Sequence, residues 1–176
     1  MNFVSIRIIT ADIKRLVRFY EQITGISVTM YTEDFGELKT PACTLAFGST
    51  RTLQLFGSDV ARPADNHTAI IEFRVGDVDE EYRKLSAVIG DALVQKPTTM
   101  PWGNRSLLFR DPDGNLVNFF APVSAEAIKK FGERSRGPSV FTAASPATRA
   151  PTRVAPRACM RKGARHYHDA VSSDSA

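Results

Sequence analysis

With 176 residues, 43% of them hydrophobic and 24% charged, the chain can bury a substantial core and has the balance of a soluble globular domain, not of a disordered chain. The formal net charge of +4 is unevenly spread, because the excess of lysine and arginine lies after Glu133. The two cysteines, Cys43 and Cys159, do not suggest a disulfide framework, and no signal-peptide pattern or apolar run of bilayer length is present. We therefore expect a cytoplasmic protein without a membrane segment.

The first part of the chain is predicted to form a strand, a helix and three further strands. Alternating apolar and polar residues predict the first strand over Phe3–Thr10. Asp12 is a predicted helix N-cap, helical spacing of apolar residues continues through Ile23, and Gly25 ends the helix. The three further strands are predicted at Ile26–Thr32, at Glu37–Phe47 with an interruption near Pro41, and at Thr52–Phe56.

The same order begins again after a polar linker at Gly57–Asn66. Ala69–Val75 alternates as a strand, and Asp77 is the predicted N-cap of the following helix. The remaining strands of this half are predicted at Ala92–Lys96, Arg105–Arg110 and Leu116–Phe120. A repeated unit of this size is too small to bury its own sheet, so we expect the two copies to pair in one domain.

A tight hairpin is predicted at Asp111–Asn115, where a proline presets φ and a glycine accepts positive φ. The strand after it carries Asn118, a polar residue in an apolar run. The earlier segment Thr44–Phe47, its polar turn and Thr52–Phe56 repeat this pattern. Gln54 is therefore expected to be the counterpart of Asn118 on the last strand of the first unit.

The composition changes after Gly132 to alanine, arginine, proline, serine and threonine with little apolar periodicity. Such a segment cannot offset the entropy cost of ordering, so we predict a basic, disordered tail at residues 133–176. The tail has neither an aromatic stacking rhythm nor an amphipathic face. We expect no specific nucleic-acid partner and no membrane partner.

The sequence resembles the vicinal oxygen chelate superfamily, the group of glyoxalases, bleomycin-resistance proteins and ring-cleaving dioxygenases. The resemblance covers about Met1 to Phe131 and rests on these motifs: Ile8–Asp12 followed by Phe19 and Tyr20, Phe73–Asp79, Pro101–Arg105 and Phe109–Asn115. It implies an α+β fold in which two βαβββ modules, at about residues 1–57 and 67–122, curl into one mixed-sheet cup within a domain of residues 1–132. A homodimer is a further possibility that the resemblance implies.

The resemblance also implies four metal-ligand positions, one on the first and one on the last strand of each module. They fall at about Ser5, Gln54, Ile70 and Asn118, a hydroxyl, two neutral amides and a hydrocarbon. These groups contribute no charge to offset the desolvation of a divalent ion, so we expect no metal and no other cofactor. His67, just before the second module, is interpreted as a surface residue, with a ligand or acid–base role as the alternative.

Strand alternation, together with the position of the Pro101–Arg105 motif in relatives, gives a set of candidate ligand-binding residues. They are Arg7, Tyr31, Gln54, Glu72, Arg74, Trp102, Arg105, Asn118 and Phe120. Arginines, amides and aromatic rings on one concave face suit a polar or anionic organic molecule with a flat apolar part. Two alternatives stay open: Arg7, Glu72 and Arg74 could form a neutralising ion cluster, and Trp102 could plug the core.

Three functions are compatible with this sequence. The favoured one is a protein that binds a drug or metabolite in the cup without a catalytic metal, as in bleomycin resistance. The alternative is a glyoxalase-like lyase or dioxygenase-like enzyme, with a metal held by non-standard ligands or with Glu72 as a general base. The third is a dimeric scaffold with an unoccupied cup.

Overall fold

The computed structural model describes residues 1–54, 56–57 and 60–135 of the chain. Contacts group Met1–Pro138 into one compact unit, whereas the second unit, Ser139–Ala176, lies outside the described residues. The predicted tail at 133–176 therefore overlaps the described part only at its first three residues, which belong to the last helix. Within the described ranges, no helix is long and apolar enough to cross a membrane.

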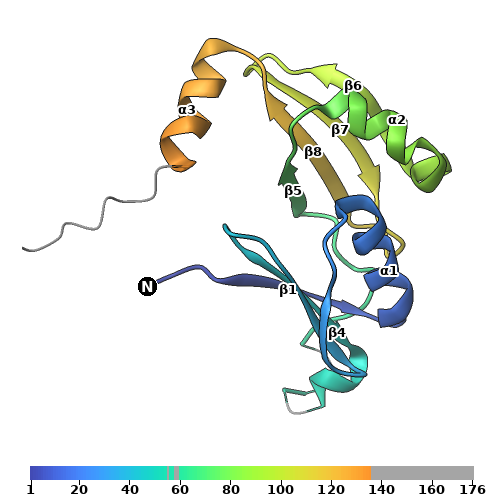
Figure 1. The fold of residues 1–176 in the computed structure, drawn as a ribbon. Helices are drawn as coiled ribbons and strands as arrows, with labels where there is room; N and C mark the ends of the chain where they lie inside the picture. The colour runs from blue at the N-terminus through green and yellow to red at the C-terminus, as the bar shows by residue number, and fades with distance from the viewer. Residues whose placement is uncertain (55, 58–59, 136–176) are drawn as a thin grey trace, which may run out of the picture. The chain divides into compact units, whose positions relative to one another are not determined.

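Two modules with the same order of elements make up the fold (Figure 1). The first consists of β1 (Ser5–Thr10), α1 (Ile13–Thr24), β2 (Thr29–Thr32), β3 (Phe35–Lys39) and β4 (Thr44–Ser49), followed by the 3-10 helix η1 (Thr50–Leu53). The second consists of β5 (Ile70–Arg74), α2 (Val78–Ile89), η2 (Gly90–Ala92), β6 (Leu93–Thr99), β7 (Asn104–Arg110) and β8 (Leu116–Pro122), and α3 (Ala125–Ser135) follows.

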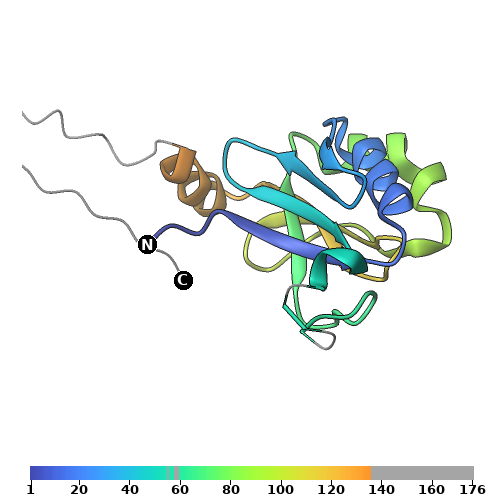
Figure 2. The same ribbon diagram turned by 90° about the horizontal axis from the view of Figure 1, so that it is seen from below.

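Each module folds into a four-stranded mixed sheet. The strand orders are β1-β4-β3-β2 and β5-β8-β7-β6, with β1 parallel to β4, β5 parallel to β8 and the other pairs antiparallel. The helices α1 and α2 lie side by side (Figures 1 and 2). The predicted α+β fold of two βαβββ modules is thus confirmed.

The predicted strand at Thr52–Phe56 is wrong. The interruption predicted near Pro41 is a complete break, because Glu37–Phe47 contains parts of two strands, β3 and β4, on either side of it. β4 is the strand that pairs with β1, and the chain then turns into η1, whose N-cap Ser49 accepts a hydrogen bond from the Arg51 amide. Alternation in Thr52–Phe56 is a short local signal, and it does not specify which segment pairs with a distant strand.

Local capping signals account for both long helices. The Asp12 carboxylate accepts a hydrogen bond from the Arg15 amide at 3.0 Å, and Gly25 ends α1 in the left-handed conformation at φ 68°. Asp77 caps α2 in the same way, accepting from the Glu80 amide at 2.9 Å. These caps, predicted from the sequence, fix the start of each helix above its sheet.

One apolar core is shared by both modules. The fully buried Tyr20 of α1 packs against Phe47 of its own sheet at 5.1 Å between ring centroids, and against Phe73 of the second module at 6.3 Å. Phe19 likewise reaches Phe109 of the second module at 6.3 Å. The helix α1 therefore contributes to the burial of both modules, as expected for units too small to fold separately.

Gly103 lies where the β6–β7 loop meets the start of α3. Its carbonyl accepts hydrogen bonds from the amides of Val123 and Ser124 at 2.8 and 3.0 Å. Its φ is +85°, and a Cβ at this position would collide with the side chain of Ser124 and lie 3.3 Å from Cβ of Ala127. This glycine allows the close approach of the loop to the helix.

We predict that Gly103→Ala lowers the free energy of unfolding by roughly 2 kcal/mol, because alanine meets both a strained φ and a steric clash. Urea denaturation measures the change. Gly76→Ala is the matched control, since a Cβ there meets no atom within 4 Å and the backbone is not in the left-handed region. Equal effects of the two substitutions would contradict the close contact at Gly103.

Candidate functional site

The first sheet carries a cluster of cations and aromatic rings on the face that points away from α1. The guanidinium carbon of Arg7 lies 4.9 Å from the ring centroid of Phe35, and that ring stacks on Tyr31 at 6.1 Å. Lys39 donates to the Tyr31 hydroxyl at 2.6 Å and forms an ion pair with Glu37 at 3.2 Å. We call these five residues the Arg7–Tyr31 cluster.

This cluster is open to solvent. Tyr31 is 53% exposed, and Arg7 is exposed as well. The pKa of Lys39 is raised, chiefly by its hydrogen bond with Tyr31 and next by that with Glu37, so Lys39 stays protonated. An exposed aromatic surface flanked by two cations can stack on a flat group and attract an anionic one.

The second sheet carries a smaller polar pair on its corresponding face. Asn118 donates from Nδ2 to Glu72 Oε1 at 2.9 Å, across the parallel β5–β8 register. Asn118 Oδ1 is buried and has no hydrogen-bond partner in the described structure. Arg74 donates to the Phe131 carbonyl at 3.3 Å, and the Phe131 ring packs on Phe120 at 5.2 Å. The helix α3 thus covers this end of the sheet, while Glu72 stays exposed.

Three predicted ligand-binding residues are not brought to either of these faces. Gln54 follows η1 as an exposed residue, since the strand predicted for it does not form. Arg105 lies on the helix side of β7, where its Nη2 donates to Asp79 of α2 at 2.6 Å. Trp102 is 66% exposed in the β6–β7 loop, which contradicts the alternative that it plugs the core.

Sequence reasoning missed three members of the Arg7–Tyr31 cluster, which are Phe35, Glu37 and Lys39. They come together because β3 lies between β2 and β4, so that Glu37 stands opposite Thr29 on one side and Ala46 on the other. The alternation of Phe35–Lys39 is visible in the sequence, but the predicted strand begins only at Glu37. The sequence also does not reveal which strands pair with this one.

The positions that the family resemblance implied for a metal do not fit one. The register places Ser5 opposite Thr44 and Ile70 opposite Leu116, so these pairs offer hydroxyls and hydrocarbon. Among the residues that the structure describes, no group of three or more histidine, cysteine, aspartate or glutamate side chains could hold an ion. His67 is exposed in the linker before β5. A divalent ion would find too few charged ligands here.

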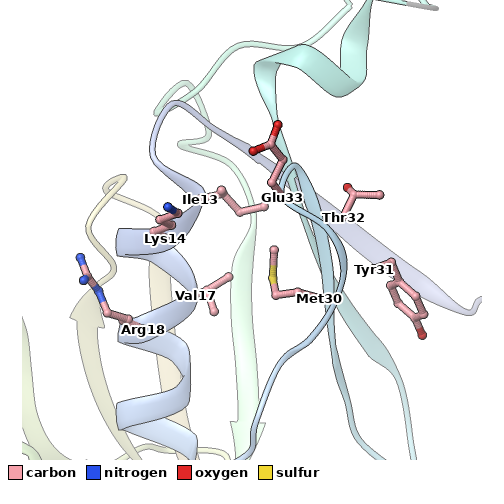
Figure 3. A pocket seen from close by; sticks show the side chains of 8 residues that line it. All are labelled: Ile13, Lys14, Val17, Arg18, Met30, Tyr31, Thr32 and Glu33. Carbon is pink, nitrogen blue, oxygen red and sulfur yellow. The ribbon is translucent and has the colours of Figure 1, made fainter.

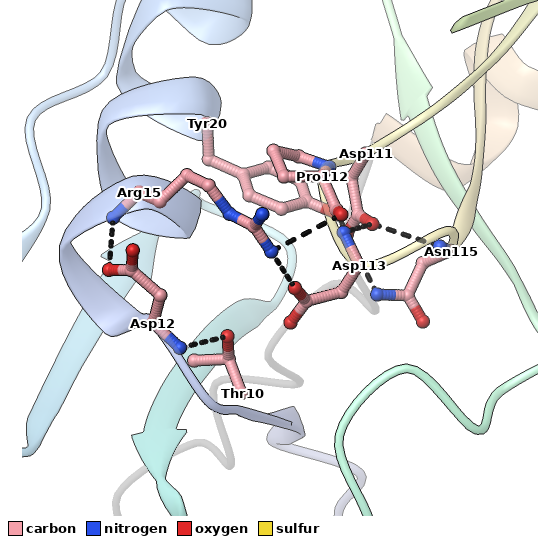
Figure 4. Close-up of polar contacts among 8 residues, drawn as sticks. All are labelled: Thr10, Asp12, Arg15, Tyr20, Asp111, Pro112, Asp113 and Asn115. Carbon is pink, nitrogen blue, oxygen red and sulfur yellow. Dashed lines mark hydrogen bonds and ion pairs between the residues drawn. The ribbon is translucent and has the colours of Figure 1, made fainter.

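The predicted hairpin also joins the two modules. Tyr20 of α1 donates to Asp111 Oδ2 at 3.0 Å, and Asp111 Oδ1 accepts from the amides of Asp113 and Asn115, both at 2.9 Å (Figure 4). Arg15 of α1 forms an ion pair with Asp113 at 2.7 Å. The hairpin of the second module is therefore fixed to the helix of the first.

Burial dominates the electrostatics of this contact. Asp111 is only 4% exposed, and burial raises its pKa above the ordinary value for aspartate. The pKa of Tyr20 is also raised, first by burial and next by the nearby Asp111 carboxylate. Tyr20 therefore remains a hydrogen-bond donor throughout the neutral and moderately alkaline range.

Comparison with known proteins identifies the family. The model of the Glyoxalase/Bleomycin resistance protein/Dioxygenase superfamily matches residues 2–119, and the chain belongs to this superfamily. A relative from Bacillus subtilis (strain 168), the uncharacterized protein YwbC, is 25% identical over 115 residues, which cover 64% of this chain and 91% of the relative.

Solved structures of similar proteins share the fold. A glyoxalase/bleomycin resistance protein/dioxygenase family enzyme from Burkholderia phytofirmans PsJN aligns with a TM-score of 0.63 at 19% identity, covering 70% of this chain and 100% of that one. A glyoxalase/bleomycin resistance protein/dioxygenase from Nocardioides aligns with a TM-score of 0.59 at 20% identity, covering 71% and 85%. At these identities the likeness concerns the fold alone.

The raised pKa of Tyr20 predicts a loss of stability at high pH. Above pH about 10 the unfolded chain releases this phenol proton while the folded protein keeps it, so stability falls by up to about 1.4 kcal/mol per pH unit. Tyr20→Phe should remove this component and, at neutral pH, cost about 1.5 kcal/mol for the lost hydrogen bond to Asp111.

Denaturant unfolding from pH 7 to 11 measures the free energy of unfolding of the wild type and of Tyr20→Phe. The lysines titrate in both proteins, so their contribution cancels in the difference between the two. Tyr82→Phe is the control, because Tyr82 is a partly buried tyrosine of α2 whose hydroxyl forms no hydrogen bond with any residue that the structure describes. An identical alkaline slope for wild type and Tyr20→Phe would contradict a buried, protonated Tyr20.

Proposed function

We propose that this chain binds a small organic molecule with a flat apolar part and an anionic group, without a catalytic metal. The observation that carries the proposal is the Arg7–Tyr31 cluster, in which Arg7 lies over Phe35 and the stacked Tyr31 ring is half exposed. A flat ligand would extend this stack, and its anionic group would pair with Arg7 or Lys39.

Binding without turnover is supported by the chemistry of the polar groups. Glu72, the candidate base, accepts a hydrogen bond from Asn118, and the neighbouring strand positions supply no charged ligands for a metal. The proposed role is therefore capture of a drug or metabolite, and the superfamily to which the chain belongs includes bleomycin resistance proteins by name.

A homodimer forms part of this proposal. Several large apolar side chains near the starts of β1 and β5 are exposed: Phe3 at 75%, Val4 at 69%, Ile6 at 45% and Ile70 at 50%. Apolar surface of this kind is favourably buried between two copies of a chain. Light scattering of the full chain measures the association.

We predict that aromatic carboxylates raise the melting temperature of the wild type, and that Arg7→Ala weakens their binding about tenfold, because it removes the cation over Phe35. Tyr31→Ala should weaken binding to a similar degree through loss of the stack. Thermal shift and titration calorimetry measure both. Arg83→Ala on α2 is the control for loss of one positive charge. Binding that survives both cluster substitutions would refute the proposed site.

The absence of a catalytic metal is tested separately. Elemental analysis of the purified full chain should give far less than one divalent ion per chain, and dialysis against EDTA should leave ligand binding unchanged. Stoichiometric metal that is lost in a Glu72→Ala, Asn118→Ala double variant would contradict the proposal. That result would favour the lyase or dioxygenase alternative.

A further inference from the structure

A groove of about 500 Å³ lies between α1 and β2. Its floor is apolar, because Ile13 and Val17 of α1 turn toward Met30 of β2, whereas the Tyr31 ring points away on the other face of the strand (Figure 3). The volume is in the range of pockets that enclose small organic ligands. The groove borders on the Arg7–Tyr31 cluster, because Tyr31 belongs to both, but the Tyr31 ring and the Met30 side chain lie on opposite faces of β2.

Gly36 helps to shape this floor. It stands opposite Met30 in the β2–β3 register, and a Cβ at this glycine would collide with the Met30 sulfur and lie 3.0 Å from Cγ1 of Val28. Because the glycine has no side chain, Met30 can lie against β3. Met30 nevertheless remains 43% exposed, so its thioether presents apolar surface to the groove.

The rim of the groove carries two exposed cations of α1. Lys14 and Arg18, one turn apart on α1, are exposed and form no hydrogen bond or ion pair through their side chains with any described residue. Arg15, between them, is by contrast paired with Asp113. The acidic residue of the rim, Glu33, lies 3.6 Å from Arg51. Among the residues that the structure describes, the α1 side of the groove is therefore positive and has no acidic side chain paired with it.

We propose that this groove binds an amphipathic organic anion. Its apolar part would lie on Ile13, Val17 and Met30, where it removes apolar surface from water. Its carboxylate or sulfonate would pair with Lys14 and Arg18, which are long and flexible enough to turn toward it. An amphipathic cation would bury the same apolar surface, but Lys14 and Arg18 would repel its charged group. This site stands independently of the function proposed above.

Calorimetric titration of the full chain with decanoate and with decylammonium separates the two contributions. Decanoate should bind at one site, and decylammonium at least about tenfold more weakly, because only the anion complements the rim. The decanoate affinity should fall with added salt. Equal binding of the two amphiphiles would overturn the proposal.

Charge reversal of the rim is the decisive variant. Lys14→Glu with Arg18→Glu should weaken decanoate binding about tenfold or more. Lys96→Glu with Lys129→Glu changes the net charge equally at two exposed residues outside the groove and should leave the affinity within about twofold. An equal loss in both double variants would mean that only overall charge matters, which would overturn the proposal.

Two further variants locate the anion and identify other occupants. Met30→Glu, at an exposed edge-strand position, should abolish decanoate binding while circular dichroism shows a retained fold. If Arg7→Ala abolishes decanoate binding and the rim variant does not, the anion occupies the Arg7–Tyr31 cluster. If decanoate does not bind and Met30→Glu dissociates a dimer seen by light scattering, the occupant is a second copy. Either result overturns the proposal.

Discussion

The contact between Tyr20 and Asp111 is the constraint on which the arrangement of the two modules depends. A carboxylate that is only 4% exposed must have its hydrogen bonds supplied by the protein. Asp111 obtains them from two amides of its own turn, from Asn115 and from Tyr20. Because the last of these donors lies on α1, the second module can satisfy its turn fully only when it is docked on the first.

This docking decides which surfaces remain for chemistry. The helix α1 packs against Phe47 of its own sheet and, through Phe19 and Tyr20, against rings of the second module. Each sheet therefore directs one set of side chains into the common core, and strand alternation directs the other set outward. The Arg7–Tyr31 cluster and the Glu72–Asn118 pair both lie on these outward faces.

The edge strand β2 contributes residues to both proposed binding surfaces. All four of its residues are exposed, and its pairing with β3 is irregular between Met30 and Thr32. Successive side chains of a strand point to opposite faces of the sheet, so Tyr31 stacks on Phe35 of the cluster while Met30 points to the groove. Both proposed sites thus rest on a strand that, in the part of the chain that the structure describes, pairs with β3 alone.

By itself the sequence determined the features that depend on neighbours along the chain. Asp12, Gly25 and Asp77 defined the helices through capping, the Asp111–Asn115 turn defined a hairpin, and the repeated order of elements defined two modules. Only the tertiary structure decided which strands pair and which groups meet. It placed β4 beside β1 in place of the segment around Gln54, and it brought Tyr20 to the hairpin. The physical reason is that caps and turns are satisfied within a few residues, whereas strand pairing and buried hydrogen bonds join residues far apart in the chain.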